Sequence, residues 1–91
     1  MRRAARIDGN HAEIRDAFRQ CGCLVESLAY VGRGVPDLLV TKNGVVRLVE
    51  VKHGRGALTP DQQAWHGKGW PVAVVRDVAD VPEIVRRMKQ P

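Results

Sequence analysis

The chain has 91 residues, a net charge of +5 and a pI near 9.9. This length predicts a single domain over residues 1–91 with a thin core. The positive charge favours a polyanionic partner, nucleic acid before membrane, unless it serves only solubility. No stretch is apolar for long enough to form a signal-peptide core or a membrane span, and Cys21 and Cys23 are too close for an unstrained disulfide. We therefore expect a cytoplasmic protein that is not exported.

A basic arm is predicted over residues 1–9. Its arginines are candidates for contacts with DNA phosphates: Arg2, Arg3 and Arg6. A frayed arm surrounded by solvent explains the same residues. The two interpretations stay open at this point.

An amphipathic helix is predicted from Asn10 to about Gln20, because apolar residues recur at helical spacing and Gly22 follows them. Glu13 in this helix has two interpretations. In the first, its side chain reaches a cleft at the edge of a sheet, because it lies to one side of the apolar stripe of the helix. Alternatively, Asn10 and Glu13 form a capping box, which explains the glutamate locally.

A β-hairpin is predicted in the middle of the chain, after a first strand over residues 24–30. Asn43-Gly44 lies between two apolar runs, and both residue types tolerate the positive φ that a type I′ turn requires. With this pair as the loop, Lys42 faces Val45, and the numbers of all paired residues sum to 87. The turn therefore predicts the register of the whole hairpin.

Asp37 and Glu50 are cross-strand neighbours in this register, with Cβ atoms roughly 5 Å apart on one side of the sheet. Lys52 points to the same side, because it follows Glu50 by two residues. Like charges that face each other are destabilising, and one lysine offsets only one of them, so a metal ion is the expected remaining counter-charge. Oxygen ligands of this kind select Mg²⁺ or Mn²⁺. Together with Lys52, such an ion can support phosphodiester hydrolysis.

Basic residues lie in loops on both sides of the hairpin. One glycine-rich turn spans residues 31–34 and a second loop spans residues 53–56. A further lysine lies near the end of the next predicted helix. These residues are the candidate DNA contacts of the folded domain: Arg33, Arg55 and Lys68.

The second half of the chain predicts a helix, a strand and a final helix. The middle helix begins at Thr59, with Pro60 in its first position and Gln62 three residues after the cap, so capping alone can explain this glutamine. Residues 72–75 form an apolar run typical of a buried parallel strand reached by a right-handed crossover. The resulting order α-β-β-β-α-β-α predicts an α/β fold with a mixed central sheet flanked by helices.

Pro36-Asp37 together with Glu50-Val51-Lys52 resembles the signature of the PD-(D/E)xK nuclease superfamily, whose core has this order of elements. A longer set of motifs resembles the virus-type replication-repair nuclease (VRR-NUC) domain: Arg33 to Leu39, Glu50 to Lys52, Leu58 to Gln62, and Trp65. The resemblance runs from about residue 10 to residue 78 and is that of a stand-alone phage or bacterial member.

This resemblance implies an endonuclease that depends on Mg²⁺ or Mn²⁺ and acts as a homodimer on branched DNA, such as Holliday junctions, in DNA repair. It also implies roles for single residues: Asp37 and Glu50 as metal-binding acids, the Val51 carbonyl as a further ligand, Lys52 as the catalytic lysine, Gln62 as the catalytic-site glutamine of the following helix, and Glu13 as the first-helix acid and an additional metal ligand. Two alternatives remain. In the first, the domain is a non-catalytic nucleic-acid-binding module whose acids are incidental. In the second, it is a nuclease subunit that needs a partner protein.

Overall fold

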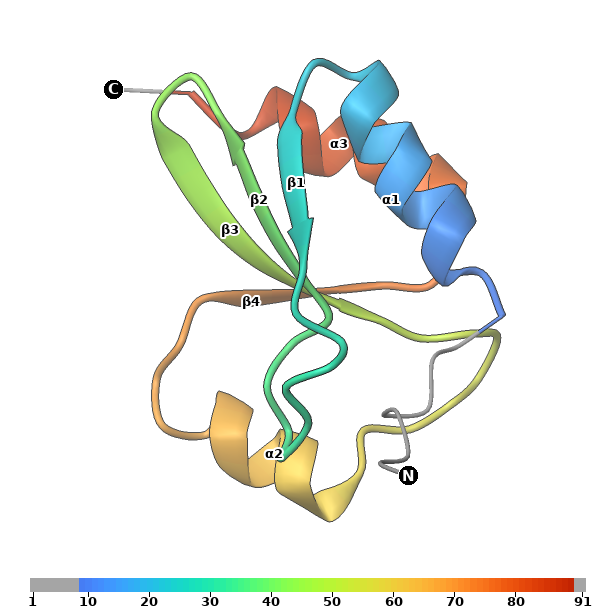
Figure 1. Ribbon diagram of the computed structural model, residues 1–91, viewed down its shortest axis with the longest axis vertical. Helices are drawn as coiled ribbons and strands as arrows, with labels where there is room; N and C mark the ends of the chain where they lie inside the picture. The colour runs from blue at the N-terminus through green and yellow to red at the C-terminus, as the bar shows by residue number, and fades with distance from the viewer. Residues whose placement is uncertain (1–8, 90–91) are drawn as a thin grey trace.

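The computed structural model describes residues 9–89, which form a four-stranded mixed sheet and its helices (Figure 1). The proposed phosphate-binding arginines of the arm, Arg2, Arg3 and Arg6, lie outside the described residues. The elements in chain order are α1 (His11–Gln20), β1 (Leu24–Ser27), β2 (Leu38–Lys42), β3 (Val45–Val51), α2 (Pro60–His66), β4 (Val72–Val75), the short 3-10 helix η1 (Val78–Asp80) and α3 (Val81–Arg86). The predicted α/β order is confirmed. Within the described chain, no helix is both long and apolar enough to cross a membrane.

The first strand is shorter than its apolar pattern predicts, because the chain turns after Ser27. The Ser27 hydroxyl accepts a hydrogen bond from the Ala29 backbone amide, and the Val31 amide donates to the Leu28 carbonyl. These bonds close a turn where the pattern favoured continued strand. The Leu28 amide still donates to the carbonyl of Asp37, so the turn remains attached to the start of β2.

The hairpin register agrees with the prediction. Asn43 and Gly44 have φ values of 56° and 76°, as a type I′ turn requires. Pairing then runs from Lys42 opposite Val45 to Leu38 opposite Val49. Strands β1, β2 and β3 are antiparallel neighbours, and β4 lies parallel to β3 after the crossover through α2.

The hydrophobic core lies on one face of the sheet. Helices α1 and α3 pack beside each other there, and their apolar residues form one buried cluster with alternate residues of the strands. The fully buried members include Ile14, Phe18, Leu38, Val40, Val49, Val75, Val81 and Met88. Helix α2 lies apart from these two helices: α1 and α3 are at the top of the view in Figure 1, and α2 is at the bottom.

The opposite face of the sheet is covered much less. Strand alternation places Leu39, Val46 and Val74 on this face, and all three are exposed, as is Leu24 on β1. Glu50 belongs to the same face but is buried, because α2 approaches the sheet only at the end of β3. The predicted flanking of the sheet by helices is therefore uneven.

Candidate active site

The end of β3 carries the acid and the lysine that the sequence singled out. Glu50 and Lys52 are two residues apart and point to the same side of the strand. Their relative exposures are only 1 % and 7 %, respectively. A carboxylate and an ammonium group are costly to bury unless they are paired or hydrogen-bonded, so this pair is an uncommon feature in so small a domain.

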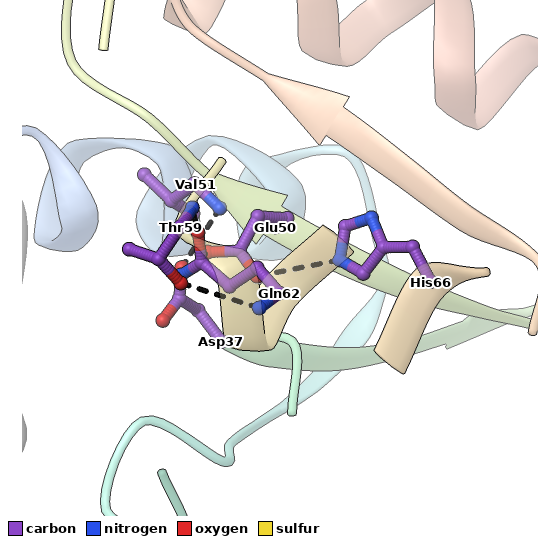
Figure 2. Close-up of polar contacts among 6 residues, drawn as sticks. All are labelled: Asp37, Glu50, Val51, Thr59, Gln62 and His66. Carbon is purple, nitrogen blue, oxygen red and sulfur yellow. Dashed lines mark hydrogen bonds and ion pairs between the residues drawn. The ribbon is translucent and has the colours of Figure 1, made fainter. Parts of the chain in front are cut away.

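Asp37 lies next to these residues, one position before β2. Continuation of the hairpin register places it opposite Glu50. Its Oδ2 atom accepts a hydrogen bond from the Val51 backbone amide, at 2.8 Å (Figure 2). This bond joins the Asp37 side chain to the strand that carries Glu50, and it leaves Oδ1 available for another partner.

Gln62 connects helix α2 to the acid pair. Its backbone amide donates to the Thr59 hydroxyl at 3.2 Å, and its Oε1 accepts from the Thr59 amide at 2.9 Å, which completes the predicted capping box. Its Nε2 then donates to Glu50 Oε2 at 3.1 Å (Figure 2). Capping therefore explains only part of this side chain, because the cap orients the amide so that its donor end faces the carboxylate.

Gly34 allows α2 to come this close. Its φ is +83°, and a Cβ atom at this position would collide with the backbone carbonyl of Asp61. A glycine in a basic loop can let a phosphate approach the backbone. In the structure the group that approaches is the first turn of α2, so this glycine helps to place Gln62 beside Glu50.

His66, which follows Trp65 at the end of α2, also reaches the site. Its Nε2 lies 3.7 Å from Glu50 Oε1, and its side chain is 15 % exposed. Burial and, second, the charge of Lys52 lower the pKa of His66. The spacing from Gln62, one helical turn earlier, was the signal that could have placed both side chains on one face of α2.

Glu13 lies apart from this cluster. It is exposed in the first turn of α1 and lines a cavity of about 340 Å³ together with Asn10, His53 and Arg76. The capping-box interpretation is wrong, because Asn10 makes no side-chain cap bond. Its Nδ2 donates instead to the carbonyls of Lys52, at 3.1 Å, and Arg76, at 3.0 Å. The start of α1 is thereby held near the end of β3, and a ligand role for Glu13 stays a prediction.

The predicted DNA contacts of the folded domain are exposed in three loops: Arg33, Arg55 and Lys68. Arg33 adopts a positive φ of 57°, which a non-glycine residue adopts at some cost. Arg76 is hydrogen-bonded to the loop around Arg55. Its Nη1 donates to the carbonyls of Gly54, at 3.0 Å, and Gly56, at 2.7 Å. Lys68 lies between two glycines after α2.

The donor atoms of the cluster fit a hard divalent cation. Asp37 and Glu50 offer carboxylate oxygens, and Val51 offers a backbone carbonyl between Glu50 and Lys52. Within residues 9–89 no group of three or more His, Cys, Asp or Glu side chains is arranged to hold a metal. Mg²⁺ binds through one or two carboxylates and keeps several waters, so two acids with a carbonyl suit it, whereas a zinc cage would need more protein ligands.

An acid before the second strand, an acid-x-lysine motif on the third and the order α-β-β-β-α-β-α define a nuclease core of the PD-(D/E)xK class. A solved structure described as a VRR_NUC domain is 34 % identical to this chain, with a TM-score of 0.65, and the match covers 84 % of this chain and 89 % of that one. No protein-family model matches the chain, and no curated protein matches it. The chain belongs to the VRR-NUC family of nuclease domains.

Proposed function

We propose that this protein is a Mg²⁺- or Mn²⁺-dependent endonuclease that hydrolyses phosphodiester bonds in branched DNA as a homodimer. The observation that carries the proposal is the buried Glu50, which lies beside the strand-anchored Asp37 and is followed on the same side by the buried Lys52. Membership of a nuclease family supports the reaction class. The two free cysteines agree with a reducing, cytoplasmic location, which stays a prediction.

The residues of the cluster have separate roles in this proposal. Asp37, Glu50 and the Val51 carbonyl hold the ion, whose chemistry is to polarise a phosphate oxygen and to lower the pKa of a water. Lys52 stabilises the negative charge that grows on the phosphate as water attacks. Gln62 keeps the Glu50 carboxylate in one orientation through its hydrogen bond.

Branched DNA and a homodimer are proposed on physical grounds. Residues 9–89 contain one such acid cluster, and one cluster cuts one strand, so a two-fold dimer would present two clusters to a four-way junction. The exposed apolar residues of the less covered sheet face, including Leu39 and Val46, support a protein contact there. The exposed arginines and lysine support binding through phosphates, which recognises DNA shape before sequence.

The test is incision of four-way, flap and linear DNA of the same sequences in Mg²⁺ or Mn²⁺. The native protein is expected to cut the branched substrates preferentially, and Glu50→Gln is expected to reduce incision at least ~100-fold. Glu83→Gln is the matched control, because Glu83 is an exposed acid on α3 whose ion-pair partners among residues 9–89 are Arg86 and Arg87.

Undiminished incision by Glu50→Gln would exclude the proposed site. Binding that needs no metal, with no incision of any substrate, would support the non-catalytic nucleic-acid-binding module instead. Metal binding with incision only after a second protein is added would support the nuclease subunit.

A further inference from the structure

A pair of stacked tryptophans lies outside the acid cluster and outside the hydrophobic core. Trp65, near the end of α2, and Trp70, just before β4, have ring centroids 4.8 Å apart and an interplanar angle of 14°. Trp70 is 51 % exposed, although one face of its ring rests on Trp65. Tryptophan is highly buried on average in folded proteins, and this chain has an aromatic content of only 4 %. The exposed ring of this pair is therefore a candidate surface for binding a partner.

The tryptophan pair lies beside the candidate active site. The ring of Trp65 meets that of His66 edge to face, with centroids 6.4 Å apart, and His66 Nε2 lies 3.7 Å from Glu50 Oε1. Three consecutive contacts therefore lead from Trp70 to the proposed metal-binding acid. Lys68, exposed between the two tryptophans in sequence, adds a positive charge to the same loop.

We propose that the Trp65–Trp70 pair stacks an unpaired base of the DNA substrate and that Lys68 contacts a phosphate next to it. This inference rests on the proposed nuclease function and adds to it a substrate class, DNA with unpaired bases near the cut. Stacking of a base on an aromatic ring accepts any base, which suits a domain that reads structure. Bases inside a continuous duplex already stack on one another, whereas a flap or an open branch point offers a free base.

The alternative ligand of the tryptophan pair is another protein, because tryptophan is enriched at protein interfaces. Lysine is depleted in those interfaces and common where phosphate is bound. Lys68 and the net charge of +5 therefore favour DNA.

The test measures binding of DNA to the 91-residue chain in EDTA, where no metal-dependent incision occurs. The chain has only two tryptophans, so its tryptophan fluorescence reports on this pair alone. An unlabelled oligo-dT is expected to quench it strongly, and a blunt duplex of equal length is expected to quench it little. Anisotropy of a labelled oligonucleotide then gives affinities, and Trp70→Ala is expected to weaken single-strand binding by about fivefold or more.

Two further variants sharpen this experiment. Trp70→Phe keeps an aromatic face and is expected to retain most of the single-strand affinity. Val78→Ala, a matched loss of an exposed apolar side chain on η1, outside both the sheet and the tryptophan pair, is expected to leave both affinities unchanged. Duplex affinity is expected to be the same in all four proteins.

Equal single-strand affinities of Trp70→Ala and the native protein would overturn the inference. A lower mass of Trp70→Ala in size exclusion with unchanged DNA affinity would also overturn it and would assign the pair to a protein contact. Because the readout is binding without metal, it stands or fails separately from incision. A protein that cuts DNA but ignores Trp70 keeps the proposed function and loses this inference.

Discussion

The two faces of the sheet are built by different physical rules. On the face covered by α1 and α3, apolar side chains pack into one cluster, with Phe18 and Leu38 fully buried. On the other face, the apolar residues are exposed, and a polar cluster lies at the end of β3. Glu50 in that cluster is almost as buried as Phe18 and Leu38. Burial on the first face needs only shape and apolar surface, whereas burial on the second needs a hydrogen-bond donor from α2. The comparison shows that a thin core supports the fold and one short helix supports the site.

The largest effect on stability is expected from the core face. Phe18→Ala removes a fully buried aromatic ring of α1 and should lower the free energy of unfolding by about 4 kcal/mol, measured by urea denaturation. Leu24→Ala is the control on the opposite face, where the side chain is 75 % exposed, and should change the free energy by less than ~0.5 kcal/mol. Similar losses for both variants would contradict the difference between the faces.

Gly34→Ala tests whether the close approach of α2 holds the site together. The new Cβ atom collides with the Asp61 carbonyl and also requires a positive φ, so a loss of about 3 kcal/mol is expected with a large fall in incision. Gly32→Ala shares the positive φ but meets no atom within 4 Å, and it should cost about 1 kcal/mol. Urea denaturation and incision rates compare the two. Equal behaviour of both variants would show that the contact with Asp61 is unimportant.

Thr59→Ala tests the capping box by itself. Loss of the hydroxyl removes the bond to the Gln62 amide and should cost about 1 kcal/mol, whereas Thr59→Ser should cost much less. We expect Thr59→Ala to lower incision as well, because the cap orients the side chain that donates to Glu50. Unchanged incision with reduced stability would limit the cap to a structural role.

The smallest effect concerns the pH dependence of stability near the site. Because burial and Lys52 lower the pKa of His66, the unfolded chain binds its proton more readily than the folded protein does. The contribution of His66 is therefore present above pH ~6.5 and is lost as the pH falls toward the lowered pKa. Urea midpoints at pH 8 and pH 5.5 should fall less in His66→Gln than in the native protein. An identical fall in both would contradict this assignment.

Local patterns were sufficient for most of the fold. Asn43-Gly44 is a two-residue signal whose geometry is intrinsic to the turn, so the register of Asp37 with Glu50 followed without tertiary information. The cap at Thr59 is local in the same way. The predicted end of β1 at residue 30 was wrong, because the pattern of apolar residues cannot show that the Ser27 side chain favours a turn. The Asn10–Glu13 box was wrong because the Asn10 amide finds carbonyl groups distant in sequence.

The sequence by itself determined the order of elements, the hairpin register and the pairing of acids and lysine on one side of a strand, because strand alternation and turn chemistry act between neighbours in the chain. Only the tertiary structure decided how those groups are supported. The approach of α2 over Gly34, the donation from Gln62 to Glu50, the place of His66 and the separation of Glu13 all depend on segments that meet only after folding. The pairing of Asp37 with Glu50 is thus a property of the hairpin, whereas the burial of Glu50 is a property of the whole domain.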